Sequence, residues 1–239
     1  MHLLERTLPK PEENLALDEA LLDEAEASGP QAEVLRIWEP VDHFVVLGRT
    51  SRWRDEARAD ACRQDNLPVL RRTSGGAAVL AGPGCLMYAV VLHYAHFPEL
   101  RMLDRAHRFV LSRLADALRP LATELRLAGT SDLAIGDLKF SGNSLRCKRE
   151  AMLYHGTVMY SMPIELVAKY LGEPPRQPAY REGRPHEAFI GNFPADREAI
   201  VAAIRRAWEP LVEIDTWPQR RVKQLIESRY GDTSWHCER

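Results

Sequence analysis

The residues with the clearest chemical potential follow Arg71, in a segment that begins Arg-Arg-Thr-Ser-Gly-Gly-Ala-Ala-Val. Adjacent glycines at Gly75 and Gly76 let backbone N–H groups approach a ligand with no Cβ in the way. An arginine such as Arg71 or Arg72 offers a planar, permanently charged fork to a carboxylate or phosphate. The segment therefore predicts an anion-binding loop, with a plain turn as the alternative, because paired glycines are common in turns.

A second group of polar residues lies on a predicted β-hairpin. Two short apolar runs flank Gly136-Asp137, and glycine at the first central position is typical of a two-residue turn. In the register that this turn sets, Asp132 faces Ser141 and lies diagonal to Lys139, at about 7–8 Å between Cβ atoms. A lysine on the inner face of such a hairpin can point its ammonium group at a phosphate or an acyl carbonyl. A solvated lysine on an edge strand is the alternative.

Five segments carry motifs that occur in one order along the chain. They are Asn14-Leu-Ala-Leu-Asp-Glu-Ala-Leu-Leu22, Arg71-Arg-Thr-Ser-Gly-Gly-Ala-Ala-Val79, Ser131-Asp132, Lys139-Phe-Ser-Gly-Asn-Ser-Leu-Arg146 and Leu153-Tyr-His-Gly-Thr157. In order and spacing they resemble the catalytic domain of the lipoate–protein ligase A family, within the biotin/lipoate ligase and octanoyltransferase superfamily. The resemblance covers nearly the whole chain, and several spaced motifs together are far more specific than any one of them.

The resemblance implies an α+β fold of the class II aminoacyl-tRNA synthetase/biotin synthetase-like type, with a mixed, mostly antiparallel sheet packed with helices. A single catalytic domain is expected over residues 1–239, without the small C-terminal accessory domain that bacterial ligases append. A separate protein that carries such a domain is therefore one expected partner.

Hydrophobic periodicity places the elements around these motifs. It predicts helices at about Asn14–Ala27, with Asn14 as the N-cap, at Asp55–Gln64 and at Leu103–Leu118. It predicts a strand at Cys85–Tyr94 whose alternate residues share one face. Arg176–Gly191 is rich in proline and glycine, and an irregular segment of that length in a compact domain is either functional or disordered.

The reaction that the resemblance implies is acyl activation followed by transfer. A lipoic or medium-chain carboxylate attacks the α-phosphate of ATP, and the lipoyl-AMP or octanoyl-AMP then meets the ε-amine of a lysine on a carrier protein. The expected carrier has a lipoyl domain, of the E2 type or the glycine-cleavage H type. Mg²⁺ is expected as well, because pyrophosphate must leave.

The resemblance also assigns the candidate site. Lys139 is the catalytic residue, which would hold both the phosphate and the acyl carbonyl oxygen. Arg72 would contact the phosphate side, Arg146 would order its loop over the adenylate, Asp132 would meet adenine or metal, and His155 would line the acyl tunnel. The substrate-binding candidates are Arg71, Arg72, Thr73, Ser74, Gly75, Gly76, Ala77, Asp132, Ser141, Gly142, Arg146, His155 and Gly156.

Two other functions remain open from the sequence. The first is an octanoyl or lipoyl transferase that uses a thioester donor and a nucleophilic cysteine beside Lys139. Cys147 is the candidate, because the neighbouring cations Lys148 and Arg149 would lower the pKa of its thiol. The second is a non-catalytic lipoyl-binding assembly factor. The ligase is favoured because the cysteine positions usual in such transferases are not occupied, Met152 standing at one of them.

Composition excludes several classes of protein. The chain has 239 residues, with 32 Lys and Arg against 34 Asp and Glu, so no excess of charge points to nucleic acid or to a membrane surface. No apolar run approaches the roughly 20 residues of a membrane span, and residues 1–10 lack the apolar core of a signal peptide. We therefore expect a cytoplasmic protein. The four cysteines include no C-x-x-C pair, which argues against a structural zinc site and a disulfide framework.

Overall fold

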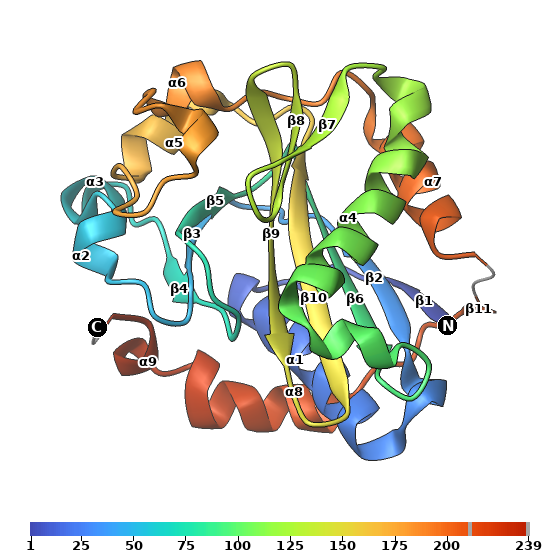
Figure 1. Ribbon diagram of the computed structural model, residues 1–239. Coiled ribbons are helices and arrows are strands. Elements are labelled where there is room, and N and C mark those ends of the chain that lie inside the picture. Colours follow the sequence, from blue (N-terminus) through green and yellow to red (C-terminus); the bar gives the residue numbers. More distant parts are fainter. Residues whose placement is uncertain (210–211, 238–239) are drawn as a thin grey trace.

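The computed structural model describes residues 1–209 and 212–237. Within these ranges an eight-stranded sheet carries helices on both faces, and a three-stranded sheet lies beside it (Figure 1). The large sheet is mixed but mostly antiparallel: of its strand pairs in the described residues, only β11/β1 and β1/β2 are parallel. The predicted α+β class is thereby confirmed.

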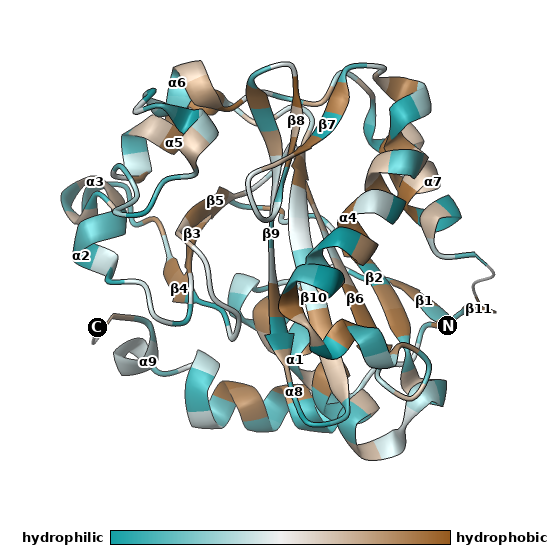
Figure 2. Ribbon diagram, viewed as in Figure 1, coloured by the Kyte–Doolittle hydropathy of each residue, from teal (hydrophilic) through white to brown (hydrophobic). Residues whose placement is uncertain are grey.

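The large sheet has the strand order β11-β1-β2-β6-β10-β9-β8-β7. Its strands are β1 (His2–Glu5), β2 (Val34–Trp38), β6 (Cys85–His93), β7 (Leu125–Ala128), β8 (Asp132–Ile135), β9 (Leu138–Cys147), β10 (Ala151–Met159) and β11 (Val212–Glu213). Strands β6 and β10 are central and pair over nine residues each. A strand buried on both faces reads as a nearly continuous apolar run, as β6 does. Figure 2 shows this apolar character along β2 and β6.

Each face of the sheet is covered by two helices that bury an apolar stripe against it. Helices α4 (Leu103–Leu118) and α7 (Arg197–Ala207) cover one face and contact Leu86, Tyr88, Val90 and Leu92 of β6, the face predicted from the alternation. Helices α1 (Pro11–Ser28) and α8 (Gln219–Leu225) cover the other face. A π-helical turn (Ile226–Tyr230) and α9 (Thr233–Cys237) follow α8.

The start of α1 differs from the prediction. Its first residue is Pro11 and its N-cap is Lys10, because proline at the first helical position needs no hydrogen bond from its nitrogen. Asn14 lies inside the helix, where its side-chain amide binds the backbone N–H and carbonyl of Leu8. Asn14 therefore fastens the segment that enters the helix.

The small sheet has the order β4-β3-β5 and presents the glycine-containing loop. Its strands are β3 (Phe44–Leu47), β4 (Val69–Arg71) and β5 (Val79–Ala81). Around it lie α2 (Trp53–Glu56), α3 (Ala59–Gln64), α5 (Ile164–Tyr170) and α6 (His186–Phe189). The helix predicted over Asp55–Gln64 is divided into α2 and α3, because Ala57 is extended and forms a bridge with Leu171.

Short 3-10 turns connect several elements, at Pro30–Ala32, Pro98–Arg101, Arg119–Leu121 and Ala179–Arg181. The last of these and α6 give local structure to residues 176–191, the segment that looked least regular in the sequence. The backbone N–H of Gly191 donates to the carbonyl of Lys139 at 3.0 Å, which fastens the end of this segment to β9. In the described part of the chain no helix is both long enough and apolar enough to cross a membrane.

Candidate active site

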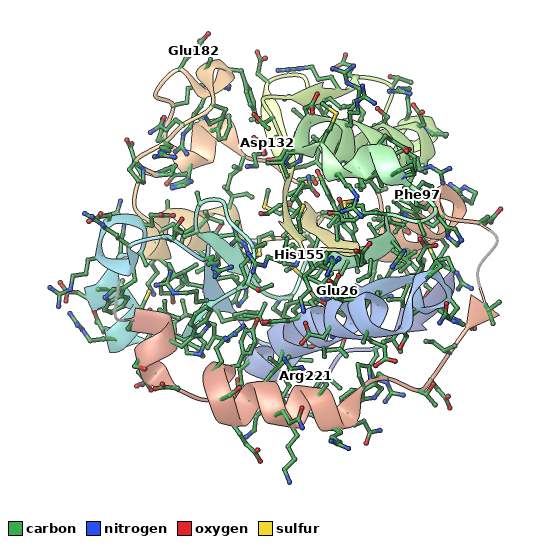
Figure 3. All side chains as sticks on the ribbon, turned by 60° about the horizontal axis from the view of Figure 1, so that its bottom comes forward. Glu26, Phe97, Asp132, His155, Glu182 and Arg221 are labelled. Carbon is green, nitrogen blue, oxygen red and sulfur yellow. The ribbon has the colours of Figure 1, made fainter. Side chains whose placement is uncertain are left out.

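A cavity lies between the loop after β4, the strands β9 and β10, and the N-terminal half of α1. With the solvent at its mouth it encloses about 690 Å³. Figure 3 shows His155 near the centre of the view beside α1, with Asp132 above it toward the top of the molecule. Eight of the predicted site residues line the cavity: Arg72, Gly76, Ala77, Asp132, Lys139, Gly142, His155 and Gly156.

The loop after β4 is folded around the side chain of Arg72. Its guanidinium donates to the carbonyls of Val46, Gly75 and Ala77, and its Nε atom donates to the Ser74 hydroxyl at 3.1 Å. Burial lowers the pKa of Arg72 to about 10, so the side chain remains a cation at neutral pH. Gly76 has a φ of +89°, and a Cβ there would lie 2.8 Å from Nη2 of Arg72. The loop conformation therefore depends on both residues.

Lys139 and Asp132 form an ion pair on the cavity wall. The Nζ atom of Lys139 lies 2.8 Å from Oδ1 of Asp132, and the hydroxyl of Tyr180 donates to the other carboxylate oxygen at 2.8 Å. A Cβ at Gly142 would lie 3.0 Å from Nζ of Lys139, so the glycine leaves room for the lysine to extend across it. The ammonium group is thus held in place at the cavity surface.

The register of this hairpin corrects one prediction. Asp132 pairs with Gly142 rather than with Ser141, because an irregularity between Leu133 and Ala134 shifts the register by one residue. Ser141 pairs with Leu133 and is fully buried. The shift brings Asp132 into direct contact with Lys139, instead of leaving it diagonal to the lysine.

His155 connects the cavity to two buried polar side chains. Its Nε2 atom lies 2.5 Å from the hydroxyl oxygen of Ser74, and its Nδ1 atom lies 3.2 Å from Oδ2 of Asp18. The other carboxylate oxygen of Asp18 accepts a hydrogen bond from Arg36 at 2.6 Å. Burial by itself would raise the pKa of Asp18, but the charge of Arg36 and hydrogen bonds from His155 and Arg36 lower it, so Asp18 is a carboxylate.

Asp18 was not predicted as a site residue. It lies within the quoted Asn14–Leu22 motif, in a helix whose buried residues are mostly apolar. An aspartate among the apolar residues of such a helix indicates a buried polar contact, because a buried charge needs a partner. The partners Arg36 and His155 lie on β2 and β10, so the local pattern of α1 does not reveal them.

The structure places other predicted residues away from the cavity surface. The guanidinium of Arg71 is buried and donates to the carbonyls of Gly48, Ser51, Trp235 and His236, so this residue fastens α9 instead of facing a ligand. Thr73 and Ser74 are buried in the loop behind the cavity, and Gly75 contributes its carbonyl to Ser144.

Arg146 lies on strand β9 and not in a loop, which corrects the expected loop over the adenylate. It pairs with Leu153 of β10 and follows Ser144, a cavity residue, by two positions. Residues two apart on a strand point to the same face. Its side chain has no hydrogen bond or ion pair to any described residue, and Arg146 is not among the residues that line this cavity or the one adjoining it.

Several cavity residues were quoted within motifs without being assigned to the site. Asn143 is the most constrained of them: it accepts a hydrogen bond from the Tyr88 hydroxyl and donates to the Ser131 carbonyl at 2.8 Å. A Cβ at Gly156 would lie 1.8 Å from Oδ1 of Asn143, so Gly156 is required for this close packing. Thr157 lines the cavity beside them.

A second cavity adjoins the first, and Lys139 lines both. It extends toward α5, α6 and residues 172–190, and encloses about 820 Å³ with the solvent at its mouth. Arg181 lines it and is only 3% exposed, and its Nη2 atom has no hydrogen-bond partner among the described residues. The guanidinium lies over the ring of Phe189, 4.9 Å from the centroid.

Among the described residues, no three His, Cys, Asp or Glu side chains come together as a metal site.

Cys147 is the last residue of β9 and packs against the apolar cluster beneath α4. That cluster lies on the opposite face of the sheet from α1. Cys147 therefore faces away from Lys139 and the cavity. Cys85 lines the second cavity, but it is fully buried, and burial raises the pKa of its thiol to about 12.

Comparison with known proteins gives consistent matches. Residues 10–189 match the profile of the family described as the lipoyl protein ligase A/B catalytic domain. A putative lipoate-protein ligase A of Aeropyrum pernix is 32% identical over 157 residues, which cover 66% of this chain. The chain spans 56% of the length of that relative.

Three solved structures share the fold at low sequence identity. A putative lipoate protein ligase from T. acidophilum with bound lipoic acid has a TM-score of 0.84 and 18% identity, covering 100% of this chain and 99% of that one. A lipoate-protein ligase A bound with ATP has a TM-score of 0.82 and 19% identity, covering 98% and 97%. A structure of a bi-partite lipoate protein ligase and its E2 lipoyl domain from Thermoplasma acidophilum has a TM-score of 0.81 and 18% identity, covering 98% and 95%.

Proposed function

The chain belongs to the lipoyl protein ligase A/B catalytic domain family, and from this premise we propose that it activates lipoate, or octanoate, with ATP and transfers the acyl group to a lysine of a carrier protein. The carboxylate oxygen attacks the α-phosphorus of ATP, pyrophosphate leaves, and an acyl-AMP forms. The amine of the carrier lysine then attacks the acyl carbonyl carbon, AMP leaves with the electron pair of the broken C–O bond, and an amide remains.

The position of Lys139 carries this proposal. Its ammonium group lies at the wall shared by two adjoining cavities, and Asp132 holds it there. Catalysis at phosphorus and at an acyl carbonyl depends on a fixed cation at the oxygens that gain negative charge. At this shared wall, one lysine can contact the α-phosphate and the acyl carbonyl oxygen of the same adenylate.

We assign the first cavity to the acyl chain and the second to the nucleotide. The first contains the apolar side chains of Leu15, Val46 and Met87, which suit an alkyl chain. The second contains Arg181, whose free Nη2 atom is a donor for phosphate or adenine. Arg72 fixes the shape of the loop between the two, in place of the direct phosphate contact expected from the sequence.

Mg²⁺ is included in the proposal as the partner of the ATP phosphates. Magnesium is usually held by substrate phosphates, water and one or two carboxylates, so a dedicated cluster of protein ligands is not required. Asp132 is the carboxylate beside Lys139 on the cavity wall and would hold the ion. When bound, the metal would neutralise charge on the leaving pyrophosphate.

We further propose that the acceptor is a lipoyl domain and that a second chain supplies an accessory domain. The Thermoplasma acidophilum ligase, which shares this fold, is a bi-partite ligase, and its structural analysis includes its E2 lipoyl domain. In this chain, the ammonium of Lys139 is partly exposed, with 25% of the side chain accessible, so an incoming lysine can approach the adenylate beside it.

The thioester transferase is not favoured by the site. Its mechanism needs a reactive thiolate beside Lys139, but Cys147 contacts the α4 side of the sheet and Cys85 has a strongly raised pKa. A non-catalytic binding protein would not need an ammonium group held between two cavities. The ligase reaction uses each of these features.

The test is a reconstituted reaction. The protein is incubated with lipoate, Mg-ATP and a lipoyl domain, and the acceptor is analysed by intact-mass and peptide mass spectrometry. We expect a lipoyl mass increase on one lysine that depends on ATP. A parallel reaction with octanoyl carrier protein and no ATP separates the two mechanisms, because modification only in this second reaction would refute the ligase proposal.

A further inference from the structure

Five buried side chains form a continuous series of hydrogen bonds from β2 to the loop after β4. The series is Arg36, Asp18, His155, Ser74, Arg72. Each of the five is at most 9% exposed. The two ends are arginines, whose side chains can only donate hydrogen bonds. The atoms of Asp18 and Ser74 that face them must therefore be acceptors, which restricts where the protons between them lie.

The protonation of His155 follows from its two neighbours. Asp18 is a carboxylate and can only accept, so Nδ1 of His155 carries a proton. Arg72 donates its Nε–H to the oxygen of Ser74, so the hydroxyl proton of Ser74 needs an acceptor elsewhere. Among the described residues, the acceptor within reach of that hydroxyl is Nε2 of His155. His155 is thus the neutral Nδ1–H tautomer, and Ser74 donates to it.

We propose that Asp18 is a positioning residue for acyl activation and transfer, acting through His155 and Ser74 on Arg72 and the glycine loop. The inference rests on the proposed function of the cavity that this loop borders. Asp18 fixes which nitrogen of His155 carries the proton, and this fixes the direction of the Ser74 hydroxyl.

The last step of the series connects it to the shape of the cavity. When Ser74 turns its hydroxyl toward His155, its oxygen faces Nε of Arg72 and holds the guanidinium. The Nη2 atom of Arg72 donates to the carbonyls of Gly75 and Ala77, and its Nη1 atom donates to the carbonyl of Val46. In a reversed series the Ser74 oxygen would accept from His155 as well as from Arg72, and its own buried proton would have no acceptor. The resulting strain would weaken the hold of Ser74 on the guanidinium and loosen the loop.

Substitution of Asp18 by asparagine reverses the series in a defined way. Nη1 of Arg36 donates to Oδ1 of Asp18, so the oxygen of an asparagine amide must remain on the Arg36 side. The NH₂ group then faces Nδ1 of His155 and donates to it, which forces the proton onto Nε2. Ser74 then receives hydrogen bonds from both His155 and Arg72, and its own proton has no acceptor.

The experiment reads the tautomer of His155 directly by NMR of protein labelled with ¹⁵N-histidine, with His155 assigned by comparison with His155→Gln. In the wild type at pH 7.5 we expect a protonated Nδ1 and an unprotonated Nε2. In Asp18→Asn we expect the reverse. For lipoyl transfer from lipoyl-AMP to a lipoyl domain, we expect Asp18→Asn to lower kcat/KM at least about tenfold, mainly through a higher KM, because the loop that borders the ligand is loosened.

Asp23→Asn is the matched control. Asp23 lies on the same helix, is also mostly buried and also accepts from two cations, Lys148 and Arg221, but it does not contact the series. It is expected to keep the tautomer of His155 and a kcat/KM within about twofold of the wild type. A similar loss of activity in Asp23→Asn would show that any weakening of α1 is sufficient, and would overturn the specific role of Asp18.

The proposal is wrong if wild-type His155 is the Nε2–H tautomer, or if folded Asp18→Asn keeps the Nδ1–H tautomer and full activity. If Asp18→Asn does not fold, Ser74→Ala replaces it: this variant removes the acceptor of Arg72 and should raise KM comparably, and an unchanged KM refutes the proposal.

The tautomer is measured without substrate. A wild type that shows the Nδ1–H tautomer and transfers no lipoyl group therefore refutes the proposed function and leaves the assigned hydrogen-bond series supported.

Discussion

The ammonium nitrogen of Lys139 lies 2.8 Å from a carboxylate oxygen of Asp132, across the two strands of the β8–β9 hairpin. Tyr180 donates to the second oxygen of the same carboxylate, so Asp132 is itself held from the side of residues 176–191. The lysine is therefore in place before any substrate binds. Such preorganisation favours catalysis, because no reorganisation is needed when negative charge develops.

Replacement of Lys139 by alanine is expected to reduce lipoyl transfer at least about 100-fold, since a fixed cation at the reacting oxygens is lost. Stability should change by only about 1 kcal/mol, because the ion pair is partly exposed. Arginine should not restore activity, because a planar guanidinium cannot occupy the place of a compact ammonium. Product formation is followed by mass spectrometry and folding by circular dichroism. Lys169→Ala, which removes another lysine–aspartate pair, is the control, and near-normal transfer by Lys139→Ala would exclude the assigned role.

The two adjacent glycines of the loop are expected to respond differently to alanine. Gly76 has a positive φ, and a Cβ there would lie 2.8 Å from Arg72. Gly75 has neither constraint, since a Cβ there meets no atom within 4 Å. Gly76→Ala should cost about 1–3 kcal/mol in backbone strain and weaken the binding of lipoyl-AMP at least about tenfold. Gly75→Ala should bind within about twofold of the wild type. Isothermal titration calorimetry checks both, and equal effects would contradict the role of Gly76.

His236 is expected to make stability depend on pH. Burial lowers its pKa, and as a neutral ring it accepts the N–H of Arg71 and donates to the carbonyl of Tyr230. Because the folded pKa is below the unfolded value of about 6.5, its contribution is complete above that value and is lost as pH falls toward the lowered pKa. Between pH 6.5 and 5, His236→Gln should reduce the slope of unfolding free energy against pH, by up to about 1.4 kcal/mol per pH unit. Urea denaturation measures this slope, and identical slopes would refute the prediction.

Other buried histidines do not disturb the comparison between the wild type and His236→Gln. Burial also lowers the pKa of His43, His107 and His186, so these residues lower stability in acid in the same direction. They are present in both proteins and cancel in the comparison. The difference between wild type and variant therefore reports His236 alone.

Cys147→Ser is expected to keep lipoyl transfer within about twofold of the wild type. The side chain packs on the α4 side of the sheet, so it cannot attack an acyl group held at Lys139. Incubation with octanoyl carrier protein in the absence of ATP should leave the protein mass unchanged. An octanoyl group trapped on Cys147 would show instead that the protein uses a thioester donor.

Much of the fold was predictable because its signals are local. The alternation in β6 correctly identified the face that α4 covers, and the apolar spacing of α4 gave its bounds, Leu103–Leu118. The motifs also identified eight residues that do line one cavity. Local patterns were sufficient here because strand alternation and helix periodicity determine which side chains share a face.

The unpredicted features depend on contacts that are distant in sequence or on backbone irregularity. The shift between Leu133 and Ala134 has no distinctive residue type, so the hairpin register beyond Ala134 was wrong by one residue. Asp18 finds its partners on β2 and β10, far along the chain. Arg71 was expected beside a ligand, but its guanidinium binds backbone carbonyls of α9, which no motif connected to the loop, and those of Gly48 and Ser51.

The opposite orientations of Arg71 and Arg72 link two parts of the molecule through one peptide unit. Arg71 binds backbone carbonyls of α9, whereas its neighbour lines the cavity. We expect a ligand that steadies the loop to steady α9 as well, because coupling between two sites is reciprocal. Hydrogen–deuterium exchange would reveal this coupling as slower exchange of the α9 amides when acyl-adenylate binds. The change would occur although α9 itself contributes no residue to the cavity. The C-terminal helix then acts as a remote reporter of an occupied site.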